Sequence, residues 1–152
     1  MDGPVVFNGW RIFTFKAFHA ALGELEADVA RLAKKDPASY KTHPKTKLLA
    51  SIYKIITQTV PADPDHKDFR MGRALGTNYA HWRRVKKGLP QCCRLFFRFA
   101  SSPVKVIVYV WINDEDALRK AGGKTDVYES FKRMLEAGRV PNGINELLKG
   151  SR

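Results

Sequence analysis

The sequence predicts an α+β domain in which two N-terminal helices and a C-terminal helix pack on one antiparallel sheet of about four strands. Two observations lead to this prediction. Apolar residues recur at helical spacing in two early segments, and they alternate or run continuously in three later ones. The resulting order is strand, helix, helix, three strands, helix. A length of 152 residues with 44% apolar residues suits a single domain over residues 1–152.

The N-terminal segment predicts a hairpin followed by a helix. Residues 5–7 and 10–15 are strand-like, and Asn8-Gly9 between them favours a primed turn. Apolar residues at helical spacing follow, and Asp36-Pro37 ends that helix. They are Phe18, Leu22, Leu25, Val29 and Leu32.

The next segments predict a second helix and the rest of the sheet. An amphipathic pattern over residues 45–59 indicates a helix that stops at Pro61. Strands are expected at about residues 82–87, 92–99 and 104–112. The last strand is apolar on both faces, so we expect it to be central and covered on both sides.

The C-terminal part predicts further short helices. Asn113-Asp114 caps one that ends at Gly122-Gly123. Asp126 and Glu129 form a capping box that opens another, which Gly138 ends. The tail after it is compatible with one more helical turn.

Positive charge is concentrated in one region. Residues 67–98 contain nine Lys or Arg and one acid, Asp68, which gives +8 of the total net charge of +12. The segments before and after this region carry only +2 each. A basic region interleaved with aromatic residues is typical of proteins that bind a polyanion, and RNA is the favoured partner.

The register of the predicted strands places these charges. A five-residue connection, 87–91, sets Arg84 opposite Arg94 and Trp82 opposite Phe96. A four-residue connection would instead bury Arg84 and Lys86, which costs several kcal/mol for each unpaired cation. We therefore expect one face of strand 92–99 to be core and the other to be a cationic surface. The core face is Cys93, Leu95, Phe97 and Phe99; the cationic face is Cys92, Arg94, Phe96 and Arg98.

Such a surface could cleave RNA as well as bind it. RNA supplies its own nucleophile, the 2′-hydroxyl, and arginines can stabilise the negative charge that develops on phosphorus. No metal or other cofactor is expected, because no cluster of Asp, Glu and His has ligand spacing. The row Asp114, Glu115 and Asp116 is interpreted as a helix cap. The adjacent pair Cys92-Cys93 predicts neither a disulfide nor a shared metal site.

Several groups could transfer protons, and the sequence does not choose between them. His81 lies next to the basic strand and is a possible general base, although most histidines are ordinary surface or core residues. Lys86 or Lys124 could act if neighbouring cations lowered its pKa. Tyr128 could donate or accept a proton near the sheet, or could simply be an aromatic on a helix face.

The sequence gives no sign of a membrane or export segment. The longest apolar run, residues 106–112, is far shorter than the roughly 20 residues that span a bilayer. No signal-like segment opens the chain, so a cytoplasmic location is expected.

Several motifs together resemble the YhaV toxin family of the PrlF–YhaV toxin–antitoxin system, within the wider RelE superfamily. The resemblance covers roughly residues 8–141. It rests on NGW, TKLLASIYKII, WRRVKKG, CCRLFFRF, VKVIVYVWINDEDALRK and KTDVYESFKRML.

The resemblance implies a RelE-like fold and a metal-independent endoribonuclease that cleaves mRNA, in many members at the ribosome. By the matching positions, the implied catalytic residues are Arg84, Lys86, Arg94 and Tyr128. Cys93 stands where the superfamily often has a tyrosine. The expected RNA-binding residues are Trp82, Arg83, Lys87, Phe96, Arg98, Arg119 and Lys124.

The resemblance also implies a PrlF-type antitoxin with an AbrB-like DNA-binding domain, so that operator DNA would be bound only through the toxin–antitoxin complex. Two alternatives remain at this point. One is a non-catalytic RNA- or ribosome-binding module that uses the same groove. The other is a DNA-binding protein, which is disfavoured because the charge lies on strands and no helix-turn-helix pattern is present.

Overall fold

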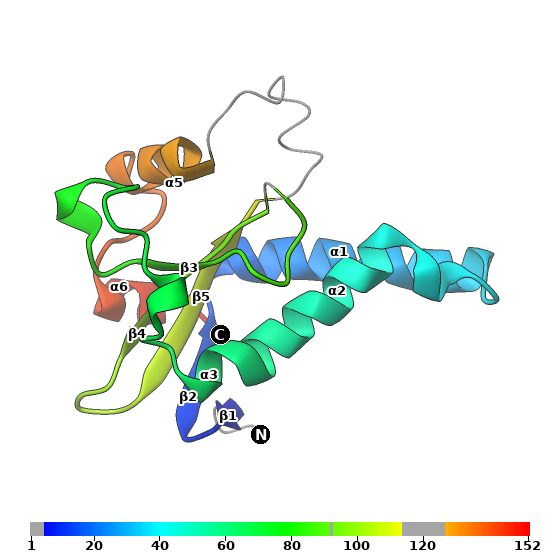
Figure 1. Cartoon of the computed structure of the whole chain (residues 1–152), viewed down its shortest axis with the longest axis horizontal. Helices are drawn as coiled ribbons and strands as arrows, with labels where there is room; N and C mark the ends of the chain where they lie inside the picture. The colour runs from blue at the N-terminus through cyan, green and yellow to red at the C-terminus, as the bar shows by residue number, and fades with distance from the viewer. Residues whose placement is uncertain (1–4, 92, 114–126) are drawn as a thin grey trace.

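In the computed structural model, a mixed five-stranded sheet lies between two layers of helices (Figure 1). The structure describes residues 5–91, 93–113 and 127–152. The strand order is β1-β2-β5-β4-β3. The strands are β1 (Val5–Phe7), β2 (Trp10–Thr14), β3 (Arg83–Val85), β4 (Leu95–Ala100) and β5 (Val106–Ile112).

The predicted α+β class is confirmed, but the prediction of an all-antiparallel sheet of about four strands is wrong. β2 pairs in parallel with β5, with Ile12 opposite Ile107, whereas the other pairs are antiparallel. The chain between β2 and β5 passes through the N-terminal helices and then β3 and β4. A crossover of this length is what a parallel pair requires. β5 is central and buried on both faces, as predicted.

The N-terminal hairpin has the predicted primed turn. Asn8 and Gly9 both have positive φ, 51° and 82°. This combination matches the twist of the flanking strands. The Asn8 side chain donates a hydrogen bond to the carbonyl of Pro61 (2.8 Å) and so ties the turn to the end of the helical layer.

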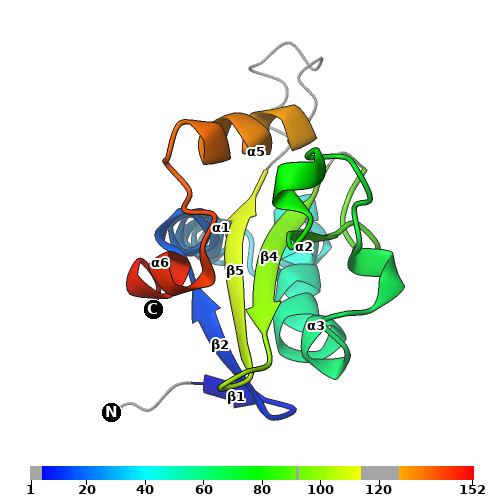
Figure 2. The same cartoon turned by 90° about the vertical axis from the view of Figure 1, so that its left-hand side faces the viewer.

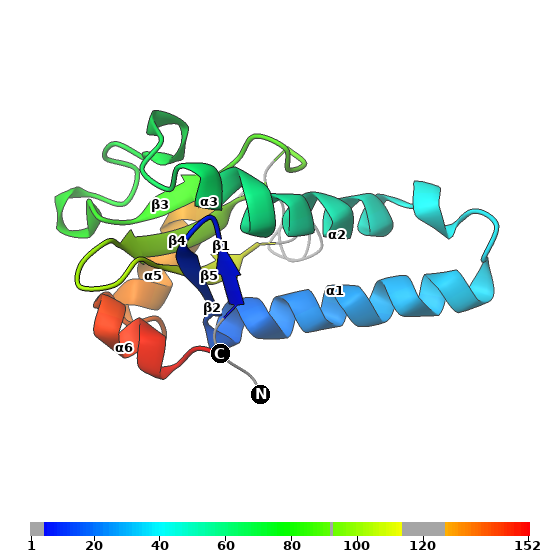
Figure 3. The same ribbon diagram turned by 90° about the horizontal axis from the view of Figure 1, so that it is seen from below.

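One face of the sheet is covered by the long N-terminal helices. The helix α1 (Lys16–Lys35) ends at Asp36, as predicted, and α2 (Pro44–Lys54) runs back beside it. Figure 3 shows that the two helices project together beyond the sheet as a hairpin. The core on this face includes Phe18, Ile52, Ile55, Val60, Phe69, Val85, Leu95, Phe97, Ile107 and Tyr109.

The second helix does not stop at Pro61 as predicted. It widens into one π-helical turn, η2 (Ile55–Thr59), and continues through α3 (Val60–Ala62). Pro61 has no N–H to donate to the preceding turn. The buried hydroxyl of Tyr109 donates instead to the carbonyl of Ile56 (3.0 Å). Burial raises the pKa of Tyr109 well above its usual value, so the hydroxyl keeps its proton.

The opposite face of the sheet is covered by the C-terminal helices, α5 (Val127–Glu136) and α6 (Ile144–Lys149) (Figure 2). Phe131 of α5 stacks on Phe96, with ring centroids 4.2 Å apart, and meets Trp82 edge-on at 4.9 Å. The predicted end of α5 before Gly138 is confirmed. The core on this face includes Phe15, Trp82, Phe96, Val108, Val110, Val127, Phe131, Leu135 and Leu147.

This second core contradicts the prediction that Trp82 and Phe96 form an exposed stacking surface. Their exposed fractions are 1% and 0%. The alternation of residues in β4 correctly separated the two faces. It could not show that α5 packs on the face that also carries the arginines, where large apolar side chains then become core.

The pairing of β3 with β4 differs from the predicted register by two residues. Arg84 lies opposite Phe96 rather than opposite Arg94. The connection is longer than expected because turns around Gly88 (φ 86°) and Pro90 delay the start of β4. A shift of two residues keeps every side chain on its face, so the predicted shared face of Arg84 and Arg94 is confirmed.

The remaining described elements are short, and some predictions fall outside the described residues. Three 3₁₀ turns, η1 (Tyr40–Thr42), η3 (Lys67–Phe69) and η4 (Thr77–Tyr79), lie in the connections. The predicted helix after Asn113 and the Asp126 end of the capping box lie outside the described residues. None of the helices that the structure describes is long and apolar enough to cross a membrane.

The Tyr109 hydroxyl should be important for stability. In Tyr109→Phe the carbonyl of Ile56 loses its buried donor, which should lower the free energy of unfolding by about 1–3 kcal/mol. Urea unfolding monitored by circular dichroism measures this change. Tyr53→Phe is the control, because Tyr53 is exposed and should change stability by less than about 0.5 kcal/mol. Equal small effects of both substitutions would contradict the assigned role.

Candidate active site

Two arginines and a tyrosine meet at one point on the α5 side of the sheet. The Nε atoms of Arg84 and Arg94 both donate to the hydroxyl oxygen of Tyr128, at 2.9 Å and 3.3 Å. Arg84 comes from β3, Arg94 directly precedes β4, and Tyr128 lies in the first turn of α5. Three elements distant in the sequence thus bring together three of the four residues predicted to be catalytic.

The two guanidinium groups are held by further hydrogen bonds that they donate to backbone carbonyls. Arg84 Nη1 donates to the carbonyl of Asp68 (2.7 Å). Arg94 Nη1 donates to the carbonyl of Cys93 (2.8 Å), and its backbone N–H donates to Asn113 Oδ1 (2.7 Å). Each arginine therefore reaches Tyr128 from a fixed position.

Sequence reasoning missed the supporting residue Asn113. Its exposed fraction is 3%, and it directly follows β5. Its carbonyl accepts a hydrogen bond from the Cys93 thiol (3.2 Å), so that it binds the segment before β4 through both backbone and side chain. A polar residue at the end of a wholly apolar strand was the available signal, but it was interpreted only as a helix cap.

The electrostatics of the site favour an anion. Burial by itself raises the pKa of Tyr128, but the hydrogen bonds and charges of Arg84 and Arg94 outweigh burial and lower it below the ordinary value. Among the residues that the structure describes, no carboxylate forms an ion pair with either arginine. Two guanidinium groups that lack a carboxylate partner among the described residues are suited to a phosphate group.

Two other predicted RNA-binding cations are paired with acids. Lys87 contacts Asp68 (2.9 Å) and Arg83 contacts Asp65 (3.2 Å). Hydrogen bonds from these cations are the leading cause of the lowered pKa of each aspartate. Arg83 also donates to the carbonyls of Ala80 and Trp82. Both cations therefore hold the loop before β3 against the sheet.

Arg98 lies apart from the arginine pair, although it shares their strand face. Its guanidinium covers the ring of Trp82 (5.7 Å) and donates to the carbonyl of Asn142. Asn142 in turn accepts a hydrogen bond from the Trp82 indole (2.8 Å). Burial, and then the charge of Arg83, lower the pKa of Arg98. These contacts indicate that Arg98 packs the segment between α5 and α6 onto the sheet.

The other predicted site residues are exposed or lie outside the described residues. Lys86 is exposed beside β3, and His81 is exposed in the turn before it. Within the described part of the chain, no hydrogen bond joins His81 to the arginine pair or to Tyr128. Arg119 and Lys124 lie outside the described residues.

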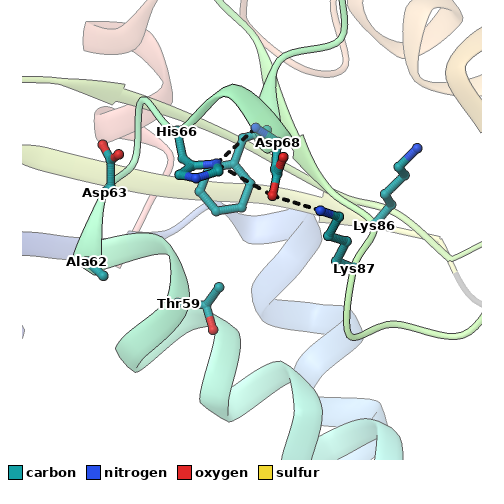
Figure 4. A pocket seen from close by; sticks show the side chains of 8 residues that line it. Thr59, Ala62, Asp63, His66, Asp68, Lys86 and Lys87 are labelled. Carbon is teal, nitrogen blue, oxygen red and sulfur yellow. Dashed lines mark hydrogen bonds and ion pairs between the residues drawn. The ribbon is translucent and has the colours of Figure 1, made fainter.

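A small pocket lies beside Asp68 and the residues that follow β3 (Figure 4). Its volume is about 210 Å³. Asp68 connects the pocket to Arg84, because its backbone carbonyl accepts a hydrogen bond from Arg84 while its side chain lines the pocket. The lining residues are Thr59, Ala62, Asp63, His66, Asp68, Phe69, Lys86 and Lys87.

Metal ligands do not gather in the described part of the chain. No group of three or more His, Cys, Asp or Glu side chains there could hold a metal ion. What the site offers is positive charge and one acidified phenol.

The described residues of the site form a positively charged centre, and comparison with known proteins places the chain in a family. Residues 12–152 match the YhaV toxin family, described as a toxin with endonuclease activity of a toxin–antitoxin system. The chain belongs to this family of endonuclease toxins.

Close relatives support the same assignment. The ribonuclease toxin YhaV of Escherichia coli K12 is 41% identical over 142 residues, which cover 93% of this chain and 91% of the relative. Toxin YhaV of Escherichia coli O157:H7 matches with the same identity and coverage. No solved structure matches the chain.

The lowered pKa of Tyr128 can be measured by NMR on protein labelled at the tyrosine ring carbon. Tyr128 should titrate below the ordinary value of about 10, whereas Tyr53 should titrate at about 12, because desolvation of its hydroxyl and its hydrogen bond to Glu26 both disfavour the phenolate. Loss of the signal in Tyr128→Phe assigns it.

The same titration tests the cause of the shift. Arg94→Gln removes one charge and one hydrogen bond to the phenolate, so the pKa of Tyr128 should rise while that of Tyr53 stays constant. An unchanged pKa of Tyr128 in this variant would contradict the assigned cause.

Proposed function

We propose that this chain is a metal-independent endoribonuclease toxin that cleaves mRNA by attack of the 2′-hydroxyl on the neighbouring phosphate. One observation carries the proposal: Arg84 and Arg94 converge on the hydroxyl of Tyr128 without a carboxylate partner among the described residues. Membership of the endonuclease toxin family supports it, and the ribonuclease name of the relative from Escherichia coli K12 favours RNA as the substrate.

The residues have distinct roles in this mechanism. Arg84 and Arg94 bind the non-bridging oxygens of the scissile phosphate and stabilise the extra negative charge of the phosphorane. The 2′-oxygen forms a bond to phosphorus, the bond from phosphorus to the 5′-oxygen breaks, and a 2′,3′-cyclic phosphate and a 5′-hydroxyl result. Lys86 adds positive charge at the rim of the site.

Tyr128 transfers protons in this scheme. Its lowered pKa increases the fraction of phenolate, which accepts the proton of the 2′-hydroxyl and then, as the phenol, donates that proton to the leaving 5′-oxygen. His81 is the alternative base, since it is exposed three residues before Arg84.

The proposal extends to partners and location. A PrlF-type antitoxin with an AbrB-like domain neutralises the chain, and the complex binds operator DNA. The substrate is mRNA in the cytoplasm, in contact with the ribosome, and the fold belongs to the RelE-like group. The family's place in toxin–antitoxin systems supports an antitoxin partner.

The test is cleavage of a defined mRNA by the purified protein in EDTA. The wild type should cut the RNA and leave 5′-hydroxyl ends, and it should not cut the same strand made with 2′-deoxynucleotides. Arg94→Ala should reduce the rate by about 10²–10³-fold, as expected when one preorganised charge contact is lost.

The matched control is Arg133→Ala, which removes an exposed arginine from α5 and should leave the rate unchanged. A folded Arg94→Ala protein with the wild-type rate would refute the assigned roles. Tight, salt-sensitive RNA binding without any product would instead favour the non-catalytic binding module.

A further inference from the structure

We infer that the pocket beside Asp68 binds the base of a nucleotide next to the scissile phosphate and thereby contributes to the choice of cleavage site. This inference rests on the proposed function. It assigns a ligand, a single RNA base, to the cavity lined by Thr59, Ala62, Asp63, His66, Asp68, Phe69, Lys86 and Lys87.

The need for such a pocket follows from the packing of α5. Proteins that act on unpaired RNA commonly hold its bases against aromatic side chains. Trp82 and Phe96, the two aromatics that the sequence places among the arginines, are buried beneath Phe131. A base near Arg84 cannot stack on these two buried rings, so the pocket is proposed as its apolar surface.

The pocket offers that surface. Phe69 is 7% exposed, and this exposed part of its ring lines one wall, while edge-on contact with the buried ring of Phe97 (5.5 Å) holds the ring in place. His66 lies edge-on to Phe69 (6.0 Å), and Thr59 and Ala62 close the opposite side from the end of the second helix (Figure 4). These walls come from the end of the second helix and from the 3₁₀ turn η3.

The size of the pocket favours one base. Its volume of about 210 Å³ is below the roughly 300–1,000 Å³ of cavities for drug-sized ligands. In this proposal only the flat base enters the pocket. The sugar and the phosphate of the nucleotide stay outside it.

The charges around the pocket suit the backbone of the same RNA strand. Lys86 and Lys87 line the rim on the β3 side, and in Figure 4 the Lys86 side chain points away from Asp68. Asp68 links Arg84 to the rim of the pocket, since its carbonyl accepts a hydrogen bond from Arg84 and its carboxylate accepts one from Lys87. In this proposal, an RNA strand with a phosphate at Arg84 continues past Asp68 to the mouth of the pocket.

His66 gives the pocket a means of distinguishing bases. Its Nδ1 accepts a hydrogen bond from the backbone N–H of Asp68 (3.0 Å). In the neutral ring the proton is then on Nε2, which can donate to a nitrogen or oxygen acceptor of a base. Shape would therefore admit a base, and this donor would favour those with a matching acceptor.

The test uses a matched pair of substitutions in one helical turn. Thr59→Trp places a large ring in the pocket, whereas Gln58→Trp adds the same ring at an exposed position that does not line it. Both proteins are incubated with a single-stranded RNA that has a randomised central segment, and the 5′ ends of the products are sequenced. Circular dichroism checks that both variants are folded.

The wild type should show a base preference at a nucleotide adjoining the cut. Thr59→Trp should weaken that preference and slow cleavage about tenfold or more, the range expected when stacking of one base is lost. His66→Ala should change the preference at the same nucleotide. Gln58→Trp should match the wild type in rate and preference.

Other outcomes overturn the inference. If Thr59→Trp keeps the wild-type rate and preference, the pocket does not bind a base. If Thr59→Trp keeps the wild-type rate and preference but is no longer neutralised by the antitoxin, the pocket belongs to the antitoxin interface instead. A wild-type protein that leaves all RNA intact would refute the proposed function itself, which the wild-type lane of the same assay distinguishes.

Discussion

The arrangement of the candidate site depends on one shared hydroxyl. Two guanidinium groups would normally repel each other at this separation, and here both donate to the oxygen of Tyr128. The hydroxyl keeps the arginines together in the absence of substrate, and their charges in turn acidify it. A phosphate at this point would meet hydrogen-bond donors that are already oriented, which is the condition for strong transition-state stabilisation.

The rest of the fold holds these three side chains in place. The stack of Phe131 on Phe96 fixes α5, and with it Tyr128, against the sheet. On the other side, Asn113 binds the backbone of Arg94 and Asp68 binds the side chain of Arg84. The single acid of the basic region thus supports the site, since its carbonyl orients Arg84 while its carboxylate neutralises Lys87.

The sequence predicted most of the fold and the centre of the site for identifiable physical reasons. Periodicity and capping residues located the helices, and Asn8-Gly9 specified the first turn. Strand alternation put Arg84 and Arg94 on one face, and this result survived a two-residue error in register because side chains repeat every second residue.

What the sequence could not supply was contact between distant segments. The parallel pairing of β2 with β5 depends on where a long crossover returns. The burial of Trp82 and Phe96 depends on which face α5 covers, and the pairing of Arg83 with Asp65 depends on how the loop before β3 folds back. None of these contacts leaves a local pattern in the chain.

The most direct test of the central claim is a double-mutant cycle on single-turnover RNA cleavage with Arg84→Ala, Arg94→Ala and the combined variant. If the two arginines act on one phosphate as a unit through Tyr128, each single substitution should lose nearly as much rate as the pair. Independent losses that multiply in the double variant would contradict the account.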